Sequence, residues 1–324
     1  MTMPPPIRIL MLGTGDFALP TFLHLLNTRH NVVTLVTQPD RPQGRKQELI
    51  PSAIKLAAIT HEIPVFQPEN VNAADSLAAI RAWNPDLLVT AAYGQILSAE
   101  LLLIPRLSGI NLHGSILPAY RGAAPVARAI QNGEIETGIT VIFMTPRIDA
   151  GGMLKVLKTS IDPNETAGML EDRLAKLGAP LVTDAIAELA EGVAKVIPQQ
   201  KSKVTKAPKL RKEDGLIEWS HSARSVHDQV RAMQPWPVAY SYLYRTYQPD
   251  VEPLRVIIHQ TEPLDLAPNA PPGTILTAIG DLLVVATGSD AVRVLDVQIA
   301  GKKTMPASDF LRGHRIISGD HFGG

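Results

Sequence analysis

The chain has 324 residues, 45% of them hydrophobic and 19% charged, which is typical of a globular protein with about two domains. Its 31 basic and 31 acidic residues cancel, so any binding to nucleic acid must depend on local patches. The chain has no cysteine, which excludes disulfides and thiolate metal sites and fits a reducing cytoplasm. No apolar run approaches the roughly 20 residues that span a bilayer, and the first residues do not form a signal peptide. We expect a cytoplasmic protein without a membrane segment.

The pattern of residues 7–36 is typical of the opening of a doubly wound α/β fold. An apolar strand is expected at 7–12, a glycine turn at 13–18, a helix around 22–26 and a second strand at 32–36. The turn, Gly-x-Gly-x-x-Ala, can cradle a dinucleotide, so a nicotinamide-dependent dehydrogenase is one alternative. It depends on this turn alone, because the next acidic residue after the second strand, Asp40, falls in a proline-rich loop.

The polar loop at 38–51 is longer than most connections in α/β units, and long loops are often functional. It contains Arg41, Arg45 and Lys46, which make it locally basic. Short helices are expected at 52–59 and 73–83. A continuous apolar strand at 87–92 indicates a parallel sheet that is covered on both faces.

The centre of the chain carries the groups with chemical potential. Asn111 and His113 are two residues apart in an extended segment, so their side chains leave the same face. Asp149 follows another strand-like run, 138–144, just past a strand end, where open α/β sheets place their chemistry. An amide, an imidazole and a carboxylate without a nucleophile suit acyl transfer to an incoming amine. The alternative is a structural loop with a capping asparagine and an exposed histidine.

Residues 162–212 contain a predicted helix and a change of composition. Asp162, Pro163 and Glu165 have the pattern of a helix start, and leucines at helical spacing continue the helix to 189. The segment 201–212 then has six basic residues and no acidic one, and Pro198 and Pro208 favour an extended linker. Such a segment can neutralise phosphates, or it can be a plain charged linker.

The carboxyl-terminal part has the pattern of a small β-barrel. A helix is expected at 220–233, and turn residues separate five strand-like runs, at 238–244, 254–260, 274–278, 282–286 and 291–298. The chain would therefore divide into an α/β domain at 1–195, a basic linker at 196–212 and a barrel domain at 213–324.

Three motifs give the chain a resemblance to the folate-dependent formyltransferase superfamily. They are Asn-x-His-Gly-Ser-x-Leu-Pro from residue 111, Arg-Gly-Ala-Ala-Pro from residue 121 and Asp-x-Gly from residue 149. Two outer motifs, Gln-Pro-Asp-Arg-Pro at 38–42 and Ala-Gly-Lys-Lys at 300–303, are similar to those of the methionyl-tRNA formyltransferases. The resemblance implies a Rossmann-like catalytic domain followed by an OB-like barrel.

It also implies an enzyme that transfers the formyl group of 10-formyltetrahydrofolate to the amine of methionyl initiator tRNA in translation initiation. Asn111 would donate to the developing oxyanion, His113 would help move the proton, and Asp149 would orient His113. The residue acting as general base stays open. The expected folate pocket consists of Leu88, Val89, Tyr93, Ser115, Ile116, Leu117 and Pro118.

For the other substrate, the resemblance implies a methionyl pocket to which Phe17 contributes. Residues 213–324 carry 9 basic and 13 acidic residues, so tRNA contact there must be confined to one face. The expected tRNA contacts are Arg41, Arg45, Lys46, Lys203, Lys206, Lys209, Lys302 and Lys303.

Two further alternatives stay open beside the dehydrogenase. A sister enzyme would use the same formyl donor on a sugar nucleotide or on water, and only the linker and the 38–51 loop argue against it. An RNA-binding module without catalysis would leave the grouping of Asn111, His113 and Asp149 unexplained. We expect a monomer without a metal ion.

Overall fold

A computed structural model describes residues 4–43 and 48–324, and their contacts form two compact units. The first unit consists of 1–125, 136–160 and 171–207, and the second of 126–135, 161–170 and 208–324. The predicted division at residues 195 and 212 stays a prediction. None of the helices in the described part of the chain is both long and apolar enough to cross a membrane.

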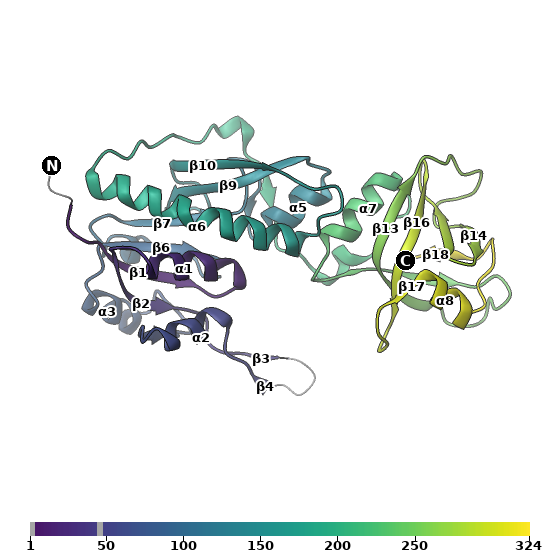
Figure 1. The fold of residues 1–324 in the computed structure, drawn as a ribbon, viewed down its shortest axis with the longest axis horizontal. Helices are drawn as coiled ribbons and strands as arrows, with labels where there is room; N and C mark the ends of the chain where they lie inside the picture. Colours follow the sequence, from purple (N-terminus) through teal and green to yellow (C-terminus); the bar gives the residue numbers. More distant parts are fainter. Residues whose placement is uncertain (1–3, 44–47) are drawn as a thin grey trace. The chain divides into compact units, whose positions relative to one another are not determined.

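A seven-stranded sheet forms the centre of the first unit, in the order β10-β9-β7-β6-β1-β2-β5 (Figure 1). The strands from β7 to β5 are parallel to one another, and β9 and β10 are added antiparallel at one edge. The mostly parallel α/β fold is therefore confirmed. The strand bounds are β1 (Arg8–Gly13), β2 (Asn31–Val36), β5 (Val65–Phe66), β6 (Leu87–Ala91), β7 (Gly109–His113), β9 (Glu136–Phe143) and β10 (Met153–Ser160).

Helices cover both faces of this sheet. On one face, Leu10, Leu12 and Leu88 belong to a buried cluster with side chains of α3 (Ala74–Ala82) and α4 (Ala99–Leu102). On the other, α6 (Ala167–Glu191) approaches β7 so closely that a Cβ at Gly178 would lie 2.7 Å from Leu112. The remaining helices of the first unit are η1 (Asp16–Ala18), α1 (Leu19–Leu26), α2 (Ala53–Thr60) and η2 (Lys201–Lys203), whereas α5 (Pro125–Gln131) belongs to the second unit except for its first residue.

The strands expected at 7–12, 32–36, 87–92 and 138–144 are present as β1, β2, β6 and β9. Ser52 caps α2, as its hydroxyl accepts from the amide of Lys55. β10 was not predicted. The two-residue strands of the first unit were not predicted either. They are β5 at the edge of the large sheet and two small pairs, β3 (Pro42–Gln43) with β4 (Glu48–Leu49) and β8 (Arg121–Gly122) with β11 (Lys206–Ala207).

The second unit contains an antiparallel sheet in the order β14-β15-β16-β13-β12-β18, which curves into a nearly closed barrel (Figure 1). A bridge between Thr274 and His321 joins its two ends, and the amide of Phe322 donates to the carbonyl of Gly273. The five strands expected from the sequence are β12 (Ala239–Tyr244), β13 (Leu254–Leu264), β14 (Ile275–Ile279), β15 (Leu282–Ala286) and β16 (Ala291–Ile299). The barrel prediction is confirmed, and the remaining elements are η3 (Lys212–Gly215), α7 (Ala223–Ala232), β17 (Met305–Pro306), α8 (Ala307–Gly313) and β18 (His321–Gly323).

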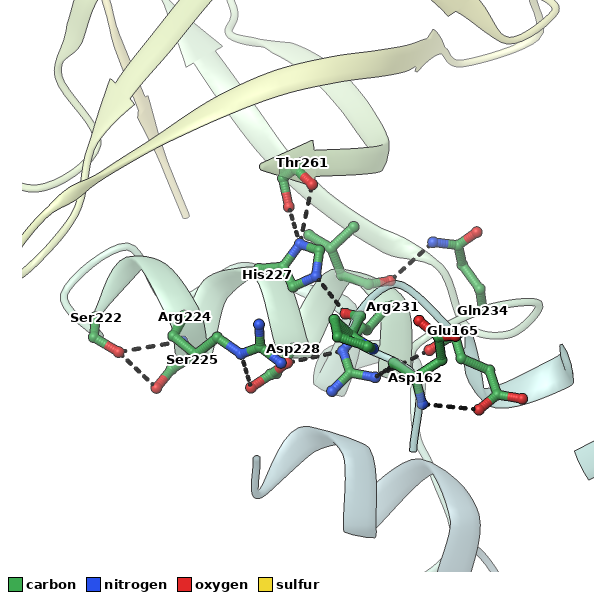
Figure 2. Close-up of polar contacts among 12 residues, drawn as sticks. Asp162, Glu165, Ser222, Arg224, Ser225, His227, Asp228, Arg231, Gln234 and Thr261 are labelled. Carbon is green, nitrogen blue, oxygen red and sulfur yellow. Dashed lines mark hydrogen bonds and ion pairs between the residues drawn. The ribbon is translucent and has the colours of Figure 1, made fainter. Parts of the chain in front are cut away.

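The predicted helix start at Asp162 is wrong, because α6 begins at Ala167. Residues 162–165 form a turn, in which the amide of Asp162 donates to Glu165 Oε2 and the amide of Glu165 donates to the carbonyl of Asp162. Side chains of α7 then hold this turn (Figure 2). His227 Nε2 lies 3.0 Å from the carbonyl of Pro163, and Arg231 Nη1 donates to the carbonyl of Glu165. These long-range contacts outweigh the local helix signal.

The buried side chains of Asp228 and Arg231 form the ion pair that anchors this arrangement. Arg231 Nε lies 2.8 Å from Asp228 Oδ1, and the two side chains are 4% and 2% exposed. Arg224 also approaches Asp228, at 3.3 Å, but its own side chain is half exposed. Removing one member of a buried pair leaves the other charge without compensation.

We predict that Asp228→Ala lowers the free energy of unfolding by about 3–5 kcal/mol, since it strands the Arg231 guanidinium in the interior. Arg224→Ala, which removes the exposed partner of the same carboxylate, should cost less than about 1 kcal/mol. Urea unfolding of both variants measures the difference. Equal losses in the two variants would show that the buried Arg231–Asp228 pair contributes no more to the free energy of unfolding than the exposed contact with Arg224.

Candidate active site

Strand β7 carries two of the three predicted catalytic side chains. Asn111 and His113 are on the same face of the strand, and the neighbouring strand β6 places Thr90 directly beside Asn111. The Thr90 hydroxyl lies 2.7 Å from Asn111 Oδ1. Because that hydroxyl donates to the Asn111 amide oxygen, it fixes which end of the amide is Oδ1, and the Nδ2 group at the other end can donate to a ligand.

The buried His113 ring is oriented by a backbone carbonyl. Its Nε2 lies 2.9 Å from the carbonyl oxygen of Tyr120, and because a carbonyl can only accept, Nε2 carries a proton. The other nitrogen, Nδ1, lies 3.6 Å from Asp149 Oδ2. This distance exceeds that of a hydrogen bond, so the carboxylate lies beside the ring without a direct hydrogen bond to Nδ1.

Asp149 reaches His113 by an unexpected route. β9 is antiparallel to β7, and the Met144 amide donates to the carbonyl of Gly109, so the loop after β9 begins at the amino end of β7. The loop then turns back and brings Asp149 beside His113, the last residue of β7. Asp149 Oδ2 accepts from the amide of Gly122 at 2.9 Å.

The three predicted catalytic residues therefore lie around one end of β7, and contributors that the sequence did not indicate support them. Thr90 could have been found from the sequence, because consecutive strands often pair and pairing of β6 with β7 places Thr90 beside Asn111. The carbonyl of Tyr120 carries no sequence signal. Neither does Gln199, whose side chain donates to the carbonyl of Asp149.

The residues predicted for the folate pocket come from two places, the buried strand β6 and the loop after β7. Leu88 and Val89 are fully buried in β6, where their side chains leave opposite faces of the sheet. Only Leu88 shares its face with Thr90 and Asn111, so a side-chain contact from Val89 would lie on the far side. The Ser115 hydroxyl donates to the carbonyl of Ala119 in the loop after β7. The Leu117 amide donates to the hydroxyl of Thr140 in β9. Folate binding by these residues, and by Ile116 and Pro118, stays a prediction.

Tyr93 belongs to the buried cluster beneath α3 and α4. Among the described residues, its hydroxyl has no hydrogen-bond partner, and burial raises the pKa of this phenol far above its usual value. Its carbonyl accepts from Thr14 Oγ1 and Gln38 Nε2, so Tyr93 connects the ends of β1, β2 and β6. The Tyr93 ring therefore packs in the core and its backbone orders the edge of the sheet, and its contact with folate stays a prediction.

The loop at 38–51 lies only partly within the described residues. Arg45 and Lys46 are outside them. Arg41 is exposed and pairs with Glu69 at 2.6 Å. Asp40 is bound by Lys55 and by Gln67 Nε2, and its hydrogen bond to Lys55 is the main cause that lowers its pKa. The acid that a dinucleotide site would need is therefore engaged in holding the loop.

The other predicted substrate contacts are accessible. Phe17 is half-buried in the turn after β1. Five lysines have exposed side chains: Lys203, Lys206, Lys209, Lys302 and Lys303. Their contact with tRNA stays a prediction.

Comparison with protein families matches residues 7–186 to the formyl transferase model and residues 209–315 to the formyl transferase C-terminal domain. The chain is 42% identical over 307 residues to the methionyl-tRNA formyltransferase of Geobacillus thermodenitrificans, covering 94% of each chain. It is also 42% identical over 317 residues to that of Citrifermentans bemidjiense, covering 98% of this chain and 96% of the relative.

Among solved structures, the sugar 3N-formyl transferase WlaRD, crystallised in the presence of dTDP and 5-N-formyl-THF, matches with a TM-score of 0.65 and 16% identity. The match covers 94% of this chain and all of WlaRD. HypX from Aquifex aeolicus in complex with tetrahydrofolic acid matches with a TM-score of 0.61 and 17% identity, over 94% of this chain and 47% of HypX. At these identities the likeness supports the fold, whereas the end-to-end relatives show that the chain belongs to the methionyl-tRNA formyltransferase family.

Proposed function

We propose that the chain transfers the formyl group of 10-formyltetrahydrofolate to the α-amine of methionyl initiator tRNA. The observation that carries this proposal is the grouping of Asn111, His113 and Asp149 around one end of β7, in a chain with end-to-end relatives of that activity. In this reaction a new bond joins the amine nitrogen to the formyl carbon, and the bond from N10 of the folate to that carbon breaks. The amine loses a proton and N10 gains one.

We assign each side chain a distinct part in this reaction. The attack places negative charge on the formyl oxygen, and Asn111 Nδ2 is available to donate to it because Thr90 engages the amide oxygen. His113 Nε2 is committed to the carbonyl of Tyr120, so Nδ1 is the nitrogen that can take the proton of the attacking amine. The Asp149 carboxylate, 3.6 Å away, stabilises the imidazolium that this transfer creates.

A formyl transferase that acts on a sugar nucleotide, or one that hydrolyses the donor, would share these three groups. The 42% identity to methionyl-tRNA formyltransferases along the whole chain favours the tRNA acceptor. The exposed lysines of the linker also favour a polyanion.

The deciding assay gives the protein labelled formyl donor and charged initiator tRNA, with elongator methionyl-tRNA as the control. We expect labelled formylmethionine on the initiator tRNA and far less on the elongator. Release of labelled formate without transfer, or transfer only to an amino sugar nucleotide, would replace the proposed acceptor.

Removal of the oxyanion donor should lower turnover strongly. We predict that Asn111→Ala reduces kcat by about 100- to 1000-fold, which is the usual loss for one such donor. His113→Ala and Asp149→Ala should also lose most turnover. Thermal unfolding should stay close to that of the unmodified chain, and a kcat near the normal value in any of the three would contradict its assigned role.

The orientation of Asn111 can be tested through Thr90. Thr90→Val keeps the shape of the side chain but removes the hydroxyl, so we predict a fall in kcat of about 10-fold, the worth of one hydrogen bond. Thr90→Ser keeps the hydroxyl and should retain most of kcat. If both variants lose the same activity, packing at this position accounts for the loss.

Phosphate contact by the linker predicts a dependence on salt. Lys203→Ala should raise the KM for tRNA without changing kcat, and should lower the slope of log KM against log salt concentration by about 1. Lys176→Ala on the exposed face of α6 is the matched control and should leave the slope unchanged. An unchanged slope in Lys203→Ala would remove that residue from the tRNA site.

A further inference from the structure

Gln199, in the predicted linker, contacts the catalytic region with every polar group of its side chain. Its Nε2 donates to the carbonyls of Asp149 and Gly151 at 2.9 and 2.8 Å. Its Oε1 accepts from Arg121 Nε and Nη2 at 3.0 and 2.7 Å. An amide has two donor hydrogens and two acceptor lone pairs, so this side chain is fully satisfied within the first unit.

The contact with Asp149 falls at a strained point of the backbone. Asp149 has a φ of +49°, in the left-handed region that residues with a Cβ seldom occupy. Such a conformation persists only where its surroundings hold it. The bond from Gln199 to the Asp149 carbonyl supplies such a hold, and it thereby sets where the Asp149 carboxylate lies relative to His113.

Thr205, six residues after Gln199, supports the position of His113. Its hydroxyl accepts from the amide of Tyr120 at 2.8 Å, and its carbonyl accepts from the amide of Arg121 at 2.9 Å. The carbonyl of Tyr120 is the group that binds His113 Nε2. A displacement of Thr205 would therefore move the acceptor that fixes the imidazole.

The same segment also fits closely against the loop that binds the Asp149 carboxylate. β11 pairs in parallel with β8, and the amide of Gly122 in β8 donates to Asp149 Oδ2. Gly122 has a φ of +130°, and a Cβ there would lie 2.4 Å from the carbonyl oxygen of Ala207. Only glycine allows this approach.

We propose that Gln199 and Thr205 are positioning residues of the formyl transfer reaction, holding Asp149 and His113 in their reactive arrangement. This inference rests on the proposed function. It gives the linker a second task besides phosphate contact, because Lys203 and Lys206 extend to solvent from the same segment. The two tasks separate kinetically: the lysines affect the KM for tRNA, and the two positioning residues affect kcat.

The first test compares Gln199→Ala with Gln200→Ala, whose side chain is exposed. We expect Gln199→Ala to lower kcat by about 100-fold with little change in the KM for tRNA, because a small displacement of catalytic groups has that effect. Gln200→Ala should behave as the unmodified chain. A normal kcat in Gln199→Ala, or a loss confined to KM, would overturn the proposal.

Gln199→Glu separates the two halves of the contact. A glutamate can still accept from Arg121, but it cannot donate to the carbonyls of Asp149 and Gly151. We expect this variant to fold and to be as slow as Gln199→Ala. Full activity in Gln199→Glu would show that the donated bonds do not position Asp149, even if Gln199→Ala were too unstable to measure.

Thr205→Val and Thr205→Ser give the corresponding pair for His113. The valine removes the acceptor of the Tyr120 amide and should lower kcat, and the serine should restore it. Loss of activity in both variants alike, or in neither, would remove Thr205 from the proposal.

A readout without catalysis distinguishes failure of this inference from failure of the proposed function. The NMR signal of the His113 Cε1 proton should shift in Gln199→Ala and Thr205→Val and stay in place in Gln200→Ala. If the unmodified chain transfers no formyl group, the proposed function fails, but these shifts still decide whether the segment holds His113. Unshifted signals would overturn the positioning role.

Discussion

The hydrogen bond from His113 Nε2 to the carbonyl of Tyr120 is the constraint on which the proposed chemistry of this site depends. It decides which ring nitrogen carries a proton at rest, and it leaves Nδ1 facing Asp149 Oδ2. In the proposed reaction, a neutral imidazole with this tautomer can accept the proton that the attacking amine must lose. Without the carbonyl, the ring could turn or change tautomer, and the carboxylate would have no fixed partner to stabilise.

The fold serves this constraint by assembling distant segments at one end of β7. The register of β6 on β7 places Thr90 against Asn111 and so orients the amide. The loop after β9 returns with Asp149, and Gly122 binds its carboxylate. The segment 199–207, which ends in β11, then binds the loop that carries Asp149 through Gln199 and the loop that carries Tyr120 through Thr205. The proposed catalytic groups are therefore on rigid strands or on loops with several independent hydrogen bonds, as a preorganised site requires.

Much of this could be predicted from local pattern. The two-residue repeat of a strand was enough to place Asn111 and His113 on one face, and apolar runs were enough to identify β1, β2, β6 and most barrel strands. The wrong helix start and the missed supporting residues share a cause, which is contact between residues far apart in the sequence. The helix start at Asp162 was displaced to Ala167 because His227 and Arg231 bind the carbonyls of the preceding turn. Gln199 and Thr205 gave no signal either, because a polar residue in a charged segment does not reveal its acceptor. The functional roles of the site residues stay proposals.

The tautomer of neutral His113 can be measured from the ring ¹⁵N chemical shifts of the ¹⁵N-histidine-labelled chain, with His113→Gln used to assign the signals. We expect a protonated Nε2 and an unprotonated Nδ1. A neutral ring with its proton on Nδ1 would contradict the proposed role of His113, since the nitrogen beside Asp149 could then not accept the proton of the attacking amine.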